Sequence, residues 1–484
     1  MGKNRIFSGS ISLEFTGILV AFFMLLTGCG SLKNLETIDA ACEAGPSVEG
    51  AASVSLFLTV RRPSVKSAKV RIANIELLVD DSWVPMSSSG VIEISSADKE
   101  YIQKFLGRQW LSGHYCRGVR FNVVDAVLLR TAGDKELLVA DPRQEIMLNS
   151  AVELEVGSRK VLSLEWDPEK GFSEAGFDGM LLKLSSGGAD RVSTNLLYVT
   201  CPDIDTVYVV SVDSYQVVDA FPAEGVPTCL AVDSISKKIY TLSSSIGKII
   251  PYDISTYVSS GAIQIPLVAS PVFMTVNNRT ETAYVLDEQG VLTSIDLVSG
   301  NMLYRNRIGS RPIYLYYVPV FEKLAVSSVI DQTIYLVNPE TLLVEDSVVL
   351  GSAPSGLVNK ENYLYIAQPS TNSVSVYDLN ARKLLKNIQV GFEPTRFVTA
   401  GDFVYGTNFV DGTISVIQSG QLSVSKEIAV GKSVREMVVS EKRRLLFVGT
   451  GGCEGSLAVI DTTGNRLIGH VELGAKPSGI AVVE

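Results

Sequence analysis

Apolar and polar residues alternate in short runs throughout residues 196–484, and turn residues separate the runs. Residues 355–390 contain four such runs, SGLVNK, YLYIAQ, SVSVYDL and KLLKNIQV. A period of two places every second side chain on the same face of an extended chain, which is the pattern of a strand rather than of a helix. We therefore predict four short strands in this segment.

The group of four runs recurs along residues 196–484 at intervals of 40 to 44 residues. A mostly aromatic column in the second run shows the spacing: Tyr198, Tyr240, Tyr284, Ala325, Tyr365, Tyr405 and Phe447. A second column, before the first run of each unit, is Pro227, Pro271, Pro312, Pro354, Pro394, Val434 and Pro477. Four strands at this period are typical of a β-propeller blade, so the columns predict seven blades.

The first unit begins at its second strand, because Leu197–Thr200 follows a Ser- and Gly-bearing stretch without a strand pattern. The segment PSGIAVVE, at residues 477–484, has the pattern of a first strand. We predict that it is the innermost strand of the first blade, with Ile480, Val482 and Val483 buried, and that it closes the ring. Closure removes the open sheet edge that would otherwise pair with other chains.

The repeat units resemble the YVTN family of bacterial β-propeller repeats. The second strand stands as YVTC at residues 198–201 and as YGTN at residues 405–408, and SVYD and AVID strands are followed by a turn with Gly and Pro. The resemblance covers about 60% of the chain. It implies the propeller fold but says little about function, because the shared columns are structural.

The first 28 residues have the pattern of a secretory signal. Lys3 and Arg5 precede the apolar stretch Ile18–Leu26, which is too short to span a bilayer. The following LTGC, at residues 26–29, resembles a bacterial lipobox, which implies cleavage before Cys29 and a diacylglyceryl group on its thiol. We expect a signal peptide at residues 1–28, a tether at 29–51 and a lipid-anchored protein of the cell envelope, at the outer membrane or cell surface. An ordinary signal peptide with a chance cysteine is the alternative.

Residues 52–185 also contain many strand-like runs, SVSLFLTV, AKVRIANIELLVD and KVLSLEW among them, and predict a β-sandwich domain. One short pattern, ADKEYIQKFLG at residues 97–107, predicts a helix. Residues 186–195 are the expected linker to the propeller, which spans residues 196–484. WVP at 83–85, LSGHYCRGVRF at 111–121 and LSLEWDPE at 162–169 resemble a transthyretin-like domain of unknown function found in bacterial lipoproteins.

Composition narrows the class of partner. The 484 residues are 46% apolar and 19% charged, which is typical of a globular chain that buries a large core. The formal net charge is −10, and the chain has no basic run, so it lacks the electrostatic footprint of nucleic-acid binding. We expect no nucleic acid among its partners.

Besides Cys29 the chain contains five cysteines, Cys42, Cys116, Cys201, Cys229 and Cys453. None has the spacing of a zinc or c-type haem motif. Export permits disulfides. Cys201 follows the second strand of the first blade and Cys229 opens the first strand of the next, so we predict a disulfide between them, with Cys453 as the competing partner.

No residues with the pattern of a catalytic or metal site stand out. The two histidines, His114 and His470, lie in strand patterns, where a structural role is expected. The sequence has neither a GxSxG elbow nor a Gly-rich phosphate loop. We therefore predict no catalytic residue, no metal ligand and no cofactor.

Basic residues of one propeller face form a possible ligand-binding mouth. Arg311, Lys432 and Lys476 lie on its loops, and Arg396 and Arg435 lie just inside the first strands of the sixth and seventh blades. The same loops carry acidic residues, namely Asp203, Asp205, Asp287, Glu288, Asp331, Asp411 and Glu454. A mixed, solvated surface is one interpretation and an anion site is another. Clustered carboxylates could also bind Ca²⁺, although no DxDxDG loop is present.

Two functions follow from these patterns. The first is a lipid-anchored envelope protein whose propeller face is a non-catalytic binding or scaffold module for an envelope protein or a glycan. The alternative is a propeller hydrolase or lactonase that uses carboxylates and a divalent metal in the central channel.

Overall fold

The computed structural model describes residues 51–61, 67–87, 90–129, 135–137, 139, 142–172, 177, 179–187, 195–452 and 454–483. These residues form β-strands joined by turns and by short 3₁₀ helices at Pro202–Ile204, Pro319–Phe321 and Pro369–Thr371. The fold is therefore all-β. No helix of the described segments is both long and apolar enough to span a bilayer. The predicted signal peptide, Cys29 and the tether up to residue 50 lie outside the described residues.

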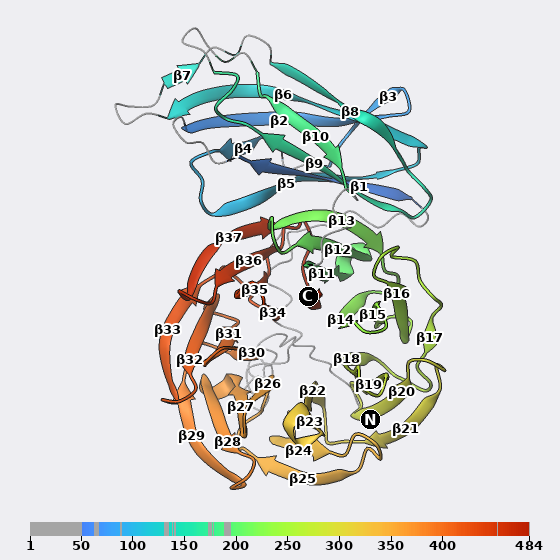
Figure 1. Cartoon of the computed structure of the whole chain (residues 1–484), viewed down its shortest axis with the longest axis vertical. Coiled ribbons are helices and arrows are strands. Elements are labelled where there is room, and N and C mark those ends of the chain that lie inside the picture. Colours follow the sequence, from blue (N-terminus) through green and yellow to red (C-terminus); the bar gives the residue numbers. More distant parts are fainter. Residues whose placement is uncertain are drawn as a thin grey trace, which may run out of the picture. The chain divides into compact units, whose positions relative to one another are not determined.

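Antiparallel four-stranded sheets follow one another around a common centre in the C-terminal part of the chain (Figure 1). The first, from its innermost strand outward, comprises β38 (Ile480–Val483), β11 (Leu196–Cys201), β12 (Thr206–Ser211) and β13 (Gln216–Pro222). The others, in the same order, are β14 (Pro227–Asp233), β15 (Lys238–Ser243), β16 (Lys248–Asp253) and β17 (Ile263–Gln264); β18 (Pro271–Asn277), β19 (Thr282–Asp287), β20 (Val291–Asp296) and β21 (Met302–Arg307); β22 (Pro312–Val318), β23 (Lys323–Ser328), β24 (Thr333–Val337) and β25 (Val344–Val349); β26 (Leu357–Lys360), β27 (Tyr363–Gln368), β28 (Ser373–Asp378) and β29 (Lys383–Gln389); β30 (Pro394–Ala400), β31 (Phe403–Asn408), β32 (Thr413–Gln418) and β33 (Ser423–Ala429); and β34 (Met437–Ser440), β35 (Leu445–Thr450), β36 (Ser456–Asp461) and β37 (Arg466–Glu472). This arrangement is of the propeller type.

The second strand of each sheet is buried on both faces, whereas outer strands such as β21 and β29 are mostly exposed. This explains the aromatic column of the sequence. Tyr198, Tyr365 and Tyr405 lie in second strands and are fully buried, because each ring packs between its own sheet and a neighbouring one. Large rings at this position fill the space between sheets and supply much of the buried apolar area.

Short polar residues at the ends of third strands hold the turns that follow them. Asp296 accepts hydrogen bonds from the backbone amides of Val298 and Ser299, both at 2.8 Å. These bonds lower the pKa of the Asp296 carboxyl. Asp378 accepts the matching pair from Asn380 and Ala381. A short side chain with an acceptor at this position therefore stabilises the turn to the fourth strand.

Strand β38 pairs antiparallel with β11, with Val483 opposite Leu196 and Ile480 opposite Val199. The hydrogen bond from the Thr200 amide to the Gly479 carbonyl, at 2.9 Å, extends the pairing. All four side chains of β38 are half-buried rather than buried. The expectation that Ile480, Val482 and Val483 are buried is therefore wrong. β38 is the innermost strand of its sheet, so it has a neighbouring strand on one edge only.

The described part of residues 51–187, called the N-terminal β domain below, forms two sheets that share one apolar core. One sheet has the order β10 (Leu182–Ser186), β9 (Arg159–Trp166), β1 (Ala52–Val60) and β5 (Tyr101–Leu111). The other has the order β3 (Ser82–Pro85), β2 (Ser67–Val79), β6 (Tyr115–Leu129) and β7 (Lys135–Leu137), with β4 (Ile92–Ser95) on β2 and β8 (Arg143–Glu153) on β6. Leu56, Val70, Phe121 and Trp166 lie in the core between the sheets.

The helix predicted at residues 97–107 is wrong, because Tyr101–Leu111 is strand β5. β5 pairs antiparallel with β1 on one edge and parallel with β37 of the propeller on the other. Tertiary pairing on both edges outweighs the weak local preference that the sequence suggests.

The contact between β5 and β37 joins the N-terminal β domain to the propeller. It pairs Tyr101 with His470 and Gln103 with Val471. Phe57 of β1 is fully buried in a core that otherwise consists mostly of propeller residues, with its ring 5.9 Å from the ring of Tyr208. The two domains are thus connected by a packed interface as well as by the chain between them.

Arg108 of β5 is the polar centre of this interface. Its guanidinium donates hydrogen bonds to the Tyr208 hydroxyl at 2.6 Å, to the Ser55 hydroxyl at 3.2 Å and to the Gly474 carbonyl at 3.1 Å. A guanidinium has five donors in a fixed fork, so one side chain can hold groups from both domains in a single geometry.

Candidate binding site in the central channel

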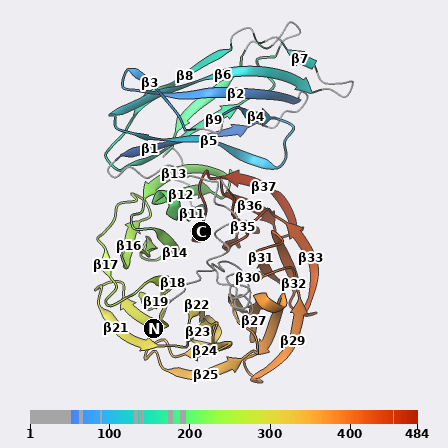
Figure 2. The ribbon, with the colours of Figure 1, turned by 180° about the vertical axis from the view of Figure 1, so that it is seen from behind.

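The innermost strands, β38, β14, β18, β22, β26, β30 and β34, stand around the centre of the propeller (Figures 1 and 2). The second residue after each position of the Pro column lies in one of these strands or immediately before it. These residues are Cys229, Phe273, Tyr314, Gly356, Arg396, Glu436 and Gly479. Five of them line one cavity, and a sixth, Tyr314, contacts its lining. Many of the residues that line the channel therefore occupy the same position in successive repeat units.

Arg396 of β30 is the central polar residue of the channel. Its Nε donates to the carboxylate of Glu436, and its Nη1 donates to the carbonyl of Thr395 at 3.2 Å. The guanidinium lies 4.7 Å from the ring centre of Tyr314 and 5.8 Å from that of Phe273. It therefore has a carboxylate on one side and aromatic rings on another.

The ion pair between Arg396 and Glu436 is shielded but still accessible, with side-chain exposures of 23% and 27%. Burial alone would lower the pKa of Arg396, but the Glu436 carboxylate outweighs it and raises that pKa. Burial also raises the pKa of Tyr314, so its hydroxyl stays neutral. A cation over aromatic faces gains attraction when water is partly excluded, and this fixes the guanidinium in place.

The cavity beside this pair has a volume of about 270 Å³. Besides Arg396, Glu436 and Phe273, its walls include Thr228, Met274 and Ser478. The site offers a fixed cation, a carboxylate, hydroxyl groups and an aromatic face in a small space. Such a set recognises a polar side chain or sugar unit by hydrogen bonds and stacking.

The five basic residues predicted for the mouth have different surroundings. Arg396 alone lines the cavity. Arg435 lies over the ring of Phe409, at 5.5 Å. Arg311 and Lys432 are exposed on loops, and the backbone amide of Lys476 donates to Asp203 at 3.4 Å. A mouth that uses all five residues stays a prediction.

Several of the acidic residues predicted on the loops accept hydrogen bonds from loop groups. Asp331 accepts hydrogen bonds from the Ser310 amide and the Ser328 hydroxyl, both at 2.7 Å. Asp411 accepts one from the Phe392 amide at 2.6 Å. Within the described ranges, no three His, Cys, Asp or Glu side chains gather closely enough to hold a metal ion.

The predicted disulfide between Cys201 and Cys229 is wrong, because both are free, buried thiols. Cys201 packs into the core that also contains Phe447, whereas Cys229 packs into a separate core with Tyr240 and Met274. The two side chains thus lie in different interfaces between sheets. Burial raises the pKa of Cys229 to about 12, so its thiol is inert. Cys453, the competing partner, lies outside the described residues.

Neither histidine lies at the channel. His470 is in the outermost strand β37, and its amide donates to the Glu100 carbonyl at 2.7 Å. Burial lowers the pKa of His470, so its imidazole is neutral at pH 7. His114 is exposed and lies 3.8 Å from Asp80 in the N-terminal β domain.

Sequence reasoning located Arg396 but missed Glu436, Tyr314 and Phe273. The missing signal was positional, since all four stand two residues after the Pro column. Arg396 and Glu436 occupy this position in consecutive repeat units, and such a spacing predicts an ion pair between neighbouring blades at the channel.

Comparisons with known proteins add the fold and nothing more. No family model and no curated protein matches this chain. Among solved structures, one titled "Dihydro-heme d1 dehydrogenase NirN in complex with DHE" is similar at 15% identity and a TM-score of 0.49, over 60% of this chain and 75% of that one. A functionally unknown protein from Desulfotomaculum acetoxidans DSM 771 is similar at 14% identity and a TM-score of 0.53, over 60% of this chain and 99% of that one. At these identities the likeness concerns the fold alone.

Proposed function

We propose that this chain is a lipid-anchored protein of the bacterial cell envelope whose propeller is a non-catalytic binding module. In this account the sheets form a seven-bladed propeller closed by β38, and the N-terminal β domain is a β-sandwich. The lipobox-like sequence at residues 26–29 supports the anchor. The partner is an envelope protein or a glycan.

The observation that carries the binding role is the channel itself. Arg396 is held by Glu436, Thr395 and two aromatic rings, so its donors keep one orientation without a ligand. A preorganised group loses little conformational entropy on binding, which favours recognition. The alternative hydrolase would need carboxylates and a divalent metal in the channel, but among the described residues the cavity lining there has one carboxylate, Glu436, and it accepts a hydrogen bond from Arg396. The hydrolase is for this reason the less favoured function.

Replacing Arg396 with Lys tests the channel. Lys keeps the charge but lacks the planar fork, so we expect the protein to lose at least tenfold in recovery of its partner from envelope extract. The measurement is quantitative affinity capture followed by mass spectrometry. The matched control is Arg382→Lys, an exposed arginine paired with Asp346 far from the innermost strands. Equal recovery by both variants would show that the channel does not bind the partner.

Replacing Cys29 with Ala tests the anchor. We expect the protein to leave the membrane fraction while keeping the melting temperature of the wild type, because the lipid is attached outside the folded domains. Each buried CH₂ of an acyl chain contributes about 0.8 kcal/mol, so losing the diacylglyceryl group removes most membrane affinity. Fractionation after salt and carbonate washes is the measurement. A variant that still sediments with membranes contradicts the lipid anchor.

A further inference from the structure

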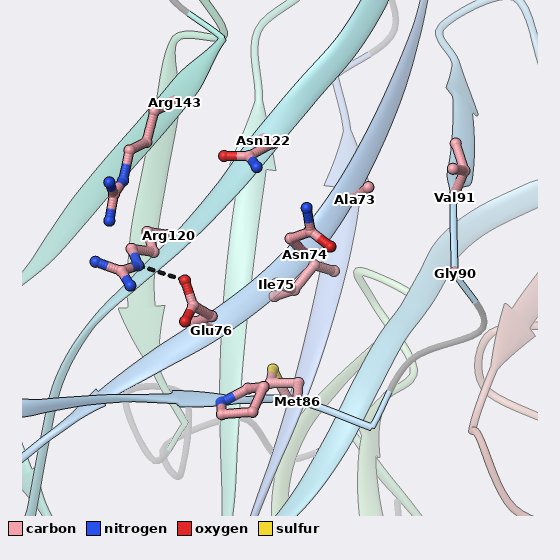
Figure 3. A pocket seen from close by; sticks show the side chains of 11 residues that line it. Ala73, Asn74, Ile75, Glu76, Met86, Gly90, Val91, Arg120, Asn122 and Arg143 are labelled. Atoms are coloured by element: carbon pink, nitrogen blue, oxygen red, sulfur yellow. Dashed lines mark hydrogen bonds and ion pairs between the residues drawn. The ribbon is translucent and has the colours of Figure 1, made fainter.

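The N-terminal β domain has a cavity of about 690 Å³ on the sheet that contains β2 and β6 (Figure 3). It opens where one edge of β2 stops pairing with β4 and begins to pair with β3. β3 pairs with Glu76–Val79 of β2, and β4 pairs with Lys69–Ile72. Between these two partners the Ile75 carbonyl accepts a hydrogen bond from the Met86 amide at 2.8 Å, and no strand of the described residues pairs with Ala73 and Asn74 on that edge. The volume is within the range of small-molecule binding sites.

A bulge in β2 shapes the floor of this cavity. The register between β2 and β6 shifts between Ala73 and Glu76, and Asn74 adopts the left-handed conformation, with φ of 53°. Bulges redirect side chains, and Asn tolerates this conformation better than most residues. The bulge brings the exposed Asn74 amide into the same cavity as Asn122 of β6.

One side of the cavity carries a network of ion pairs, in which Arg120 lies between the carboxylates of Glu76 and Glu145, the latter at 3.9 Å. Arg120 donates to the carboxylate of Glu76, lies 4.3 Å from the ring centre of Trp83 and has a side-chain exposure of only 16%. Arg143, which is more exposed, pairs with Glu145 at 3.2 Å. Figure 3 shows both guanidinium groups on the same side of the cavity as Glu76.

The rest of the lining is amide and apolar. Figure 3 shows Asn74 and Asn122 between the two arginines and the side formed by Ala73 and Val91. Each amide can both donate and accept a hydrogen bond, as a sugar hydroxyl does. The Met86 side chain adds an apolar surface below.

We propose that this cavity binds a short acidic saccharide, with the carboxylate at Arg143 and Arg120 and the hydroxyl groups at Asn74, Asn122 and Glu76. A phosphate ion has few donors to offer the Glu76 carboxylate, whereas a sugar hydroxyl can donate to it. Guanidinium groups pair well with carboxylates. The inference rests on the proposed envelope location for the class of ligand, and it does not depend on the channel.

The test is isothermal titration of the detergent-solubilised full-length protein with a trimer of galacturonate. We expect binding that weakens as salt is added, at least tenfold weaker binding of the neutral galactose trimer, and at least tenfold weaker binding of the acidic trimer by Arg143→Gln. Arg117→Gln is the matched control, because Arg117 pairs with Asp81 and does not line the cavity. Asn122→Leu tests the hydroxyl contacts and is expected to lose affinity as well.

The proposal is overturned if the acidic trimer fails to bind, if Arg143→Gln binds it as tightly as the wild type, or if inorganic phosphate displaces it at equal concentration. Arg396→Lys separates this proposal from the proposed function. That variant is expected to lose the channel partner and to keep wild-type affinity for the trimer. If Arg396→Lys lowers the affinity for the trimer, the saccharide binds in the channel, and the proposal that it binds in the cavity of the N-terminal β domain is overturned.

Discussion

Deleting residues 477–484 is expected to cause aggregation or to lower the melting temperature of the propeller by roughly 10 °C or more. The deletion removes β38 and exposes the edge of β11. It also removes the hydrogen bonds between Thr200 and Gly479 and the bond from the Ser478 hydroxyl to the Thr228 carbonyl, at 2.9 Å. Each backbone bond contributes about 1 kcal/mol, and the half-buried side chains add to the loss. The total is several kcal/mol, a large share of a typical margin of about 5 to 15 kcal/mol.

The control for this prediction is an equally long deletion at residues 31–38, in the expected tether. We expect it to leave the melting temperature unchanged in differential scanning calorimetry. If the two deletion variants have the same melting temperature, β38 does not close the ring, and the seven-bladed arrangement has to be abandoned.

The second large effect is the pH dependence of stability at Glu472. Its side chain is 8% exposed, at the interface between β37 and β5, and its carboxyl accepts a hydrogen bond from the Phe105 amide at 2.9 Å. Burial raises the pKa of Glu472 to about 7, from an ordinary value of 4.5, although the Phe105 amide opposes the shift. The folded protein therefore binds a proton more tightly here than the unfolded chain does.

The direction of the pH dependence follows from the linkage between proton binding and folding. The stabilisation is complete below pH 4.5 and is lost as the pH rises towards 7, where the buried carboxyl ionises. The loss amounts to about 3 kcal/mol, since one pKa unit corresponds to about 1.4 kcal/mol. Glu472→Gln keeps an acceptor for Phe105 and does not ionise, so we expect it to be more stable than the wild type at pH 8 and about equal at pH 4.

Urea unfolding at several pH values measures this difference. Glu427→Gln, on the exposed face of β33, is the control and is expected to follow the wild type at every pH. A wild-type-like pH profile for Glu472→Gln would mean that Glu472 is not protonated in the folded protein at neutral pH.

The strands of the propeller could be predicted from the sequence because each sheet repeats the same pattern of buried strands and polar turns. The aromatic column marks second strands that are buried on both faces, and the short polar residues mark turns that need an acceptor, as at Asp296. The helix predicted at residues 97–107 was wrong because contacts with distant parts of the chain, rather than the local pattern, decide the structure there. β5 is extended because β1 and β37 pair with it, and both partners are distant in sequence.

The candidate sites were less predictable than the fold. Arg396 could be placed near the channel, but its pair with Glu436 and its contact with Tyr314 depend on side chains from separate sheets meeting at the centre. The cavity in the N-terminal β domain depends on a change of strand partner along β2, which no local pattern shows. The thiols of Cys201 and Cys229 failed to pair because the faces on which they lie follow from packing rather than from spacing.

Site-specific photocrosslinking tests the central claim, binding through the channel, most directly. Benzoylphenylalanine in place of Phe273, which lines the channel cavity, is compared with the same group in place of Tyr304, on the exposed outer strand β21 of the same sheet. We expect a crosslinked adduct in the intact envelope from position 273, its loss when Arg396→Lys is added, and no adduct from position 304. An adduct from position 304 alone, or from neither position, would contradict a binding module that acts through its channel.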